Sequence, residues 1–217
     1  MATPGQLVQS MADTLGLPVA TVIQYDRQLA EGGLRSKGGR GTSAAQVTAR
    51  DAANLLIAIA ASPLAGPSIK EAVHTCAAYG SLKVLPRASW SDRFPNLGLP
   101  SMAELAEGHS LRDALCVLID AAGHGEAISI PGARDMPADF CLSITFEGPR
   151  PWAEILADGS VGKGTPSKMA RLVYASRDAG SGSCGRNPRH WRDLHQSRWI
   201  SFATIRALGS LIARGPK

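Results

Sequence analysis

The feature that most constrains this chain is a pair of short helical patterns separated by only a few residues, Leu15-Gly16-Leu17-Pro18. The first pattern begins at Thr3-Pro4-Gly5-Gln6, where a threonine N-cap, a proline at the first helical position and a glutamine at the third form a capping box. Its apolar residues recur at helical spacing, namely Leu7, Val8, Met11 and Leu15. The second pattern ends at Gly32-Gly33, and its apolar residues are Val19, Val22, Ile23 and Leu29. The sequence therefore predicts two short helices joined by a tight turn.

Two helices in this arrangement are typical of a helix-turn-helix, whose second helix enters the major groove of DNA. The second helix, Val19 to Glu31, is predicted to present short polar, glutamine and arginine side chains outward, because these groups can hydrogen-bond to base edges. The predicted outward residues are Ala20, Thr21, Gln24, Arg27 and Gln28, with Tyr25 at the edge of the face. The alternative is an ordinary helical hairpin whose polar face contacts water.

The next segment, Leu34 to Ser43, is rich in glycine and basic residues and is predicted to be a wing. Glycines allow the backbone to approach a phosphate closely, and basic side chains supply salt-dependent attraction. Thr48 and Asp51 then form a second capping box, which opens a third helix. Residues 1–62 are therefore interpreted as a winged helix-turn-helix domain. Its predicted DNA-binding residues are Thr21, Gln24, Tyr25, Arg27, Gln28, Arg35, Lys37, Arg40 and Thr42.

Residues Leu15 to Arg40 resemble the DNA-binding half of MerR-type regulators. The residues that carry the resemblance are Thr21-Val22, Tyr25-Asp26-Arg27, Gly33-Leu34 and the wing from Arg35 to Arg40. The chain departs from that pattern at Ile23, where the family usually has arginine, and no long dimerising helix follows. The resemblance implies a bacterial or prophage regulator that binds DNA through a winged helix-turn-helix. The family's effector and metal sites are not implied.

A breaker-rich stretch from Ser62 to Pro67 predicts a boundary, followed by a second domain over residues 68–217. Helices are expected from Ser68 to Tyr79 and, after a Ser110 cap, up to Gly123. Alternating apolar residues over 140–147 predict a half-buried strand, and a second strand is expected over 152–157, closed by a turn at Asp158-Gly159. The expected fold class is α+β, in which a mixed helical domain with a small antiparallel sheet serves for oligomerisation, partner binding or further DNA contact.

The net charge of +5 is unevenly distributed, because residues 160–217 contain 11 basic and 2 acidic side chains. A basic segment with interleaved aromatics can bind phosphates and stack on bases, so a second basic patch is predicted at Arg186, Arg189, Arg192 and Arg198. The alternative is a basic loop followed by a terminal helix that buries Trp199, Phe202 and the apolar residues after them. The sequence favours the terminal helix from Trp199 onward and leaves the rest open.

No motif predicts catalysis, a metal site or a cofactor. The cysteines, Cys76, Cys116, Cys141 and Cys184, are far apart and are expected to be reduced. The five histidines are scattered, and Gly162-Lys163-Gly164-Thr165 lacks the first glycine of a phosphate loop. A nucleic-acid-processing enzyme would need clustered carboxylates or a metal, which the sequence does not offer.

The expected function is that of a sequence-specific transcriptional regulator that binds double-stranded DNA, as a homodimer or with a partner in the transcription machinery. The chain has neither a signal peptide pattern nor an apolar run long enough for a membrane span, so a cytoplasmic protein without a membrane partner is expected. The alternative is a structural or adaptor protein, for example a phage component, that uses the winged helix for protein contact.

Overall fold

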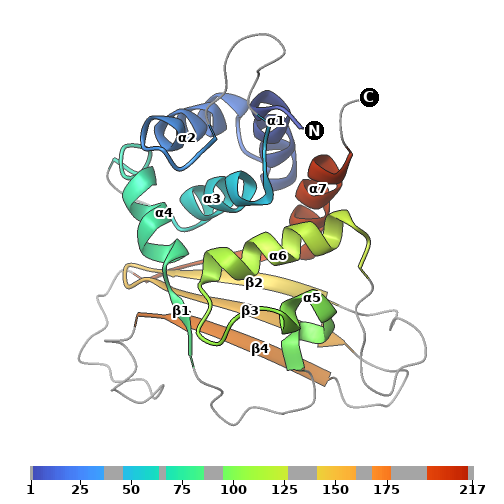
Figure 1. The fold of residues 1–217 in the computed structure, drawn as a ribbon. Helices are drawn as coiled ribbons and strands as arrows, with labels where there is room; N and C mark the ends of the chain where they lie inside the picture. Colours follow the sequence, from blue (N-terminus) through green and yellow to red (C-terminus); the bar gives the residue numbers. More distant parts are fainter. Residues whose placement is uncertain are drawn as a thin grey trace.

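The computed structural model describes residues 2–36, 46–63, 67–85, 95–126, 141–159, 168–176 and 195–214. The first three helices are α1 (Pro4–Leu15), α2 (Val19–Glu31) and α3 (Ala49–Ala60), as the sequence predicted (Figure 1). The capping boxes set two of the starts: the side chains of Thr3 and Thr48 each accept a hydrogen bond from the third residue of the helix. Gly16 ends α1 in the left-handed conformation, with φ 66°.

Four further helices and one 3-10 turn follow among the described residues. They are α4 (Ala72–Gly80), the 3-10 helix η2 (Pro95–Gly98), α5 (Pro100–Ala103), α6 (Leu111–Gly123) and α7 (Phe202–Ala213). The helix expected from Ser68 begins only at Ala72, since residues 68–71 form turns. The cap at Ser110 is confirmed, because its side chain accepts from the backbone N–H of Asp113.

The described strands form one antiparallel sheet in the order β1-β4-β3-β2-β5, so the predicted α+β class is confirmed. The strands are β1 (Lys83–Val84), β2 (Cys141–Gly148), β3 (Trp152–Gly159), β4 (Lys168–Ala175) and β5 (Gln196–Ser201). β2 pairs with β3 on one side and with β5 on the other, so Thr145 lies opposite both Glu154 and Trp199. The turn expected at Asp158-Gly159 is wrong, because both residues are within β3 and pair with β4.

The alternation predicted for β2 is confirmed in part: Leu142, Ile144 and Phe146 are buried, but Ser143 on the other face is buried too, and residue 140 lies outside the described residues. The prediction that Trp199 is buried in the terminal helix is wrong: the residue lies on β5 and its side chain is 61% exposed. Trp199 points to the opposite side of the sheet from Ile200, which is buried, as successive residues of a strand do.

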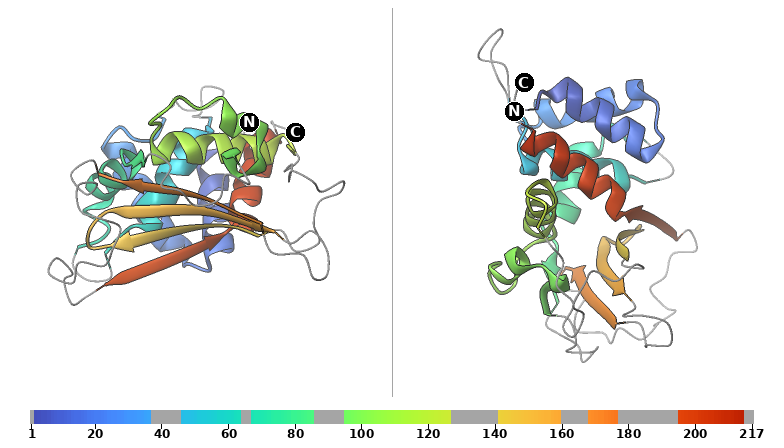
Figure 2. Two further views of the ribbon diagram at one scale, coloured as in Figure 1. Left: turned by 90° about the horizontal axis from the view of Figure 1, so that it is seen from below. Right: turned by 90° about the vertical axis from the view of Figure 1, so that its right-hand side faces the viewer.

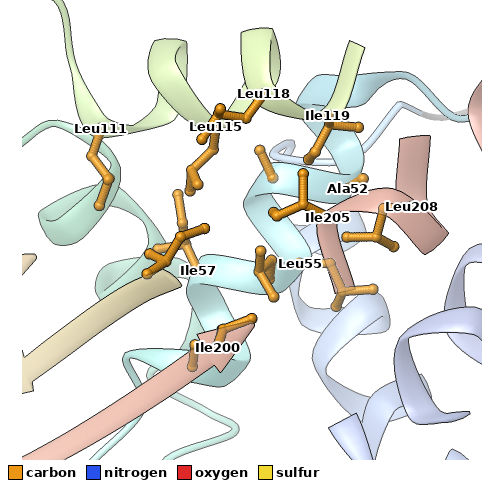
Figure 3. Close-up of a cluster of buried hydrophobic side chains, with 14 of the residues drawn as sticks. Ala52, Leu55, Ile57, Leu111, Leu115, Leu118, Ile119, Ile200, Ile205 and Leu208 are labelled. Carbon is orange, nitrogen blue, oxygen red and sulfur yellow. The ribbon is translucent and has the colours of Figure 1, made fainter. Parts of the chain in front are cut away.

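The core is centred on α3, in which every residue except Arg50 is buried. Ala52 and Leu55 of α3 lie beside Ile119 of α6 and Ile205 of α7, and Ile57 lies near Ile200 of β5 (Figure 3). One continuous buried cluster therefore includes side chains from both segments that the sequence analysis treated as separate domains, 1–62 and 68–217.

The helices of the N-terminal half gather on one side of the sheet (Figure 2). Tyr79 of α4 joins them to it, because its hydroxyl donates to the carbonyl oxygen of Glu147 at 2.7 Å. Cys76, Cys116 and Cys141 carry free thiols, and Cys184 lies outside the described residues. In the part of the chain that the structure describes, no helix has the length and apolarity needed to cross a membrane.

Candidate nucleic-acid interface

α2 packs through one face against α1, α3 and α4 and leaves the other face uncovered by any described element. Val22, Tyr25 and Leu29 form the buried face. Tyr25 was predicted at the edge of the DNA-binding face, and this is wrong, because the residue is only 6% exposed. Its ring fills the space between α2 and its neighbours, where it cannot reach a ligand.

The outer face of α2 agrees only in part with the predicted reading face. Ala20, Gln24 and Arg27 are exposed as expected, whereas Thr21 and Gln28 are half-buried. The side-chain amide of Gln28 donates to Glu31 at 3.2 Å. Gln24 and Arg27 are therefore the predicted residues best placed to reach a ligand in front of α2.

Two apolar residues of α2 were assigned to the buried stripe and lie outward instead. Val19 is 37% exposed and Ile23 is 43% exposed. At 100° per residue Ile23 shares a face with Ala20 and Arg27, so a full helical-wheel comparison of the second helix contains the signal that would have found it.

Asp51, at the start of α3, holds both ends of the segment that connects α2 to α3. Its carboxylate accepts from the backbone N–H and hydroxyl of Ser36, at 2.7 and 3.0 Å, on the side where the segment leaves α2. It also accepts from the backbone N–H and hydroxyl of Thr48, at 2.9 and 2.8 Å, where the segment returns. Asp51 is 4% exposed, so these bonds are shielded from water. The sequence indicated only the capping role of Asp51, because a contact with Ser36 has no local pattern.

The two ends of the connecting segment, at Ser36 and Thr48, are called the loop base below. Further contacts fix the end that follows α2. The side-chain amide of Asn54 donates to the carbonyl oxygen of Leu34 at 2.6 Å. Arg35 pairs through Nε with the Asp26 carboxylate at 2.8 Å, and its Nη1 donates to the carbonyl oxygen of Ser36 at 3.0 Å. Burial raises the pKa of the Asp26 carboxyl, an effect that Arg35 opposes and Asp51 reinforces. Arg35 therefore supports the loop base, whereas the sequence analysis expected it to contact phosphate.

The loop base and the outer face of α2 meet at a shallow depression of about 460 Å³. It is lined by Arg35 and by five residues of α2, namely Ile23, Asp26, Arg27, Ala30 and Glu31. A ligand against α2 would therefore also lie beside the point where the connecting segment leaves the helix. The other predicted residues of that segment, Lys37, Arg40 and Thr42, lie outside the described residues.

Arg198, predicted as part of a second basic patch, has a structural role. It is half-buried, and its Nη1 donates to the carbonyl oxygens of Ile59 at 2.7 Å and Ala60 at 3.4 Å. These carbonyls end α3 without partners in the helix, so a guanidinium stabilises them. The patch is wrong at this position, and Arg186, Arg189 and Arg192 lie outside the described residues.

The titratable side chains in the described ranges do not gather into a metal site, since no group of three or more His, Cys, Asp or Glu is placed to hold an ion. What the arrangement offers is an exposed helix face with amide, guanidinium and apolar groups beside an anchored loop. Comparison with protein-family models, with curated proteins and with solved structures finds no match for this chain.

Proposed function

We propose that this chain is a transcriptional regulator that binds double-stranded DNA in a sequence-specific way through a winged helix-turn-helix. α2 enters the major groove, and the segment between Ser36 and Thr48 contacts the adjacent phosphates. Within that segment Lys37 and Arg40 supply positive charge, and Gly38, Gly39 and Gly41 allow close backbone approach.

The observation that carries this proposal is the anchoring of both ends of the connecting segment on Asp51, beside the exposed face of α2. Two of the four hydrogen bonds to Asp51 belong to the capping box of α3, and the two from Ser36 tie the other end of the segment to the same buried carboxylate. Because Ser36 and Thr48 bond to the same carboxylate, the two ends of the segment lie close together, which is what a wing beside α2 requires. The two elements can then contact one duplex together.

The polar side chains on the outer face of α2 support distinct roles. Gln24 has an amide that can make a bidentate contact with adenine, and Thr21 can donate to or accept from a base edge. Arg27 is exposed one turn further along and contacts phosphate. Gln28 is tied to Glu31 and supports the C-terminal end of the same face.

The electrostatic role of Arg27 can be measured through salt dependence. Binding of a mixed-sequence duplex by the wild type should weaken linearly in a plot of log affinity against log salt concentration. Arg27→Ala should weaken binding to all sequences and reduce that slope by about one. The matched control is Arg206→Ala, which removes an exposed arginine from α7 and should leave the slope unchanged. Equal slopes for the wild type and Arg27→Ala would exclude α2 as the contact surface.

A second candidate function is that of a structural or adaptor protein that uses α2 to contact another protein. Exposed Val19 and Ile23 favour it, because apolar side chains on an uncovered helix face are typical of protein interfaces. The positive charge of Arg27 is offset by the negative charge of Glu31 on this face, which also favours a protein partner. In that case duplex binding would show no sequence preference, and Gln24→Ala would behave like Gln9→Ala, which removes an exposed glutamine from α1.

A further inference from the structure

Two side chains on the outer face of α2 have no role in the proposed function as stated above. Ile23 and Val19 are 43% and 37% exposed, and Trp199 on β5 is the other exposed large apolar residue among those described. Residues four apart on a helix lie on one face about 6 Å from each other. Val19 and Ile23 therefore form a short apolar strip along α2.

The surroundings of this strip are polar and small. Ala20, Gln24 and Arg27 are exposed beside it, and Tyr25, the aromatic residue of α2, is buried on the other side. Protein interfaces usually concentrate their binding energy in aromatic and arginine side chains that fill pockets. The strip has no aromatic anchor, and Arg27 beside it is assigned to a phosphate by the proposed function.

Charge points to a polyanionic occupant. Residues 32–48, which connect α2 to α3, contain three basic and no acidic side chains. Of the two carboxylates of α2, Asp26 is paired with Arg35, so these two charges cancel, and Glu31 is exposed at the end of the helix; both line the depression beside Ile23. In the sequence, Lys37 and Arg40 then exceed the remaining charges of Arg27 and Glu31, which cancel, and this surplus favours a ligand that carries phosphates.

We infer that Ile23 and Val19 contact the 5-methyl groups of thymines, so that α2 selects duplexes with two thymines about two base pairs apart. This inference rests on the proposed function. The thymine methyl is the apolar group that base edges present in the major groove, and aliphatic side chains recognise it by contact. Successive base pairs are about 3.4 Å apart along the duplex, so two side chains about 6 Å apart reach base pairs two steps apart. Gln24, next to Ile23, then selects adenine nearby.

Replacing thymine by uracil tests the inference, because it removes only the methyl group and leaves base pairing intact. A duplex selected by the protein from a random pool is synthesised with uracil at one thymine at a time, and the dissociation constant is measured for each. Loss of one buried methyl should weaken binding by the wild type about fourfold at two positions of the site. Ile23→Ala should bind the all-thymine duplex more weakly and be insensitive to uracil at one of these positions, and Val19→Ala at the other.

Each outcome bears on a separate statement. Specific binding that is indifferent to uracil at every position would overturn the thymine contacts and leave the proposed function intact. Sensitivity to uracil that persists unchanged in both variants would assign the methyl contact to other residues and overturn the inference as well. Failure to select any duplex would remove the proposed function itself. The uracil duplexes test the wild-type protein, so the result does not depend on how the variants fold.

Discussion

At the residue scale, Asp51 combines two roles that usually belong to different side chains. It completes the capping box of α3, and it holds Ser36 at the other end of the connecting segment. α6 has the same capping box, in which the Asp113 carboxylate accepts from the backbone N–H and hydroxyl of Ser110. Among the described residues the Asp113 carboxylate makes no hydrogen bond to a distant segment, so it provides a matched comparison.

Asp51→Ala should destabilise the protein by about 3 kcal/mol, because it removes a cap and leaves the donors of Ser36 and Thr48 without their acceptor. Asp113→Ala should cost only about 1 kcal/mol, because it removes only the carboxylate of a capping box. Urea unfolding of both variants measures the difference. Equal losses would mean that the Ser36 contacts contribute nothing to stability, and that the loop base is not fixed by Asp51.

The hydrogen bond between His109 and Tyr174 predicts that the stability of the protein depends on pH. The Nδ1 of His109 lies 3.1 Å from the carbonyl oxygen of Ala106, which can only accept, so Nδ1 carries the proton. Nε2 must then accept from the hydroxyl of the buried Tyr174, at 2.9 Å. Burial lowers the pKa of His109 below its usual value of 6.5, although the bond to Ala106 and the charge of Asp113 oppose this.

The neutral form of His109 is favoured by folding, so its contribution to stability is complete above pH 6.5 and decreases as the pH falls below that value. The free energy of unfolding should therefore fall between pH 7.5 and pH 5, and His109→Gln should reduce this fall. His74→Gln, which removes an exposed histidine from α4, serves as the control and should keep the wild-type difference. An unchanged pH dependence in His109→Gln would contradict the assigned protonation state.

At the element scale, the crossing of α6 and α7 depends on two glycines. A Cβ added at Gly209 would lie 2.5 Å from the backbone nitrogen of Gly123 and would also meet the carbonyl oxygen of Ile119. The two helices therefore touch backbone to backbone. Because α7 also packs on α1, this crossing positions the N-terminal helices on the rest of the molecule.

Gly209→Ala should destabilise the protein by about 2 kcal/mol, because the atoms that its Cβ meets are backbone and cannot turn away. Gly5→Ala on α1 is the control: a Cβ there has open space, and alanine should stabilise the helix by about 0.5 kcal/mol. Thermal unfolding of the two variants should therefore shift in opposite directions. A stabilised Gly209→Ala would contradict the close crossing.

The elements also show what the sequence can reveal. Three capping boxes, at Thr3, Thr48 and Ser110, predicted helix starts to the residue, because a cap is a local pattern of side chain and backbone. β2 was predicted from its alternation. β4 was missed, because Leu172 and Val173 lie on opposite faces and both are apolar, which obscures a period of two. β5 was missed because Ile200 is its single buried residue.

The candidate site was predictable to the extent that it is local. The exposure of Gln24 and Arg27 follows from the helical period of α2. The contacts of Arg35 with Asp26 and of Arg198 with the end of α3 depend on where distant segments meet, and no local pattern encodes this. Some of the basic side chains that were predicted to contact phosphate therefore bond to other parts of the protein instead.

At the scale of the whole molecule, the predicted domains share a single buried cluster among the described residues. α3 belongs to the predicted DNA-binding segment, yet its N-terminal end holds the loop base and its C-terminal end is held by Arg198 of β5. Leu55, Ile57 and the other buried residues of α3 need α6, α7 and β5 to shield them from water.

A fragment of residues 1–62 should therefore lack a cooperative unfolding transition, because it would expose the apolar side of α3. Circular dichroism during heating, compared with the full chain under the same conditions, measures this. A sharp transition in the fragment would show that the N-terminal segment is an independent domain. It would also mean that the shared core is not required for the geometry of α2.

The central claim, that α2 reads duplex DNA, is tested most directly by selection from a random duplex pool with the full chain at about 150 mM salt, where non-specific binding is weak. The account predicts an enriched motif for the wild type and for Gln9→Ala, and loss of preference at one position of that motif for Gln24→Ala. An absence of enrichment, or an identical motif for Gln24→Ala, would contradict recognition by α2.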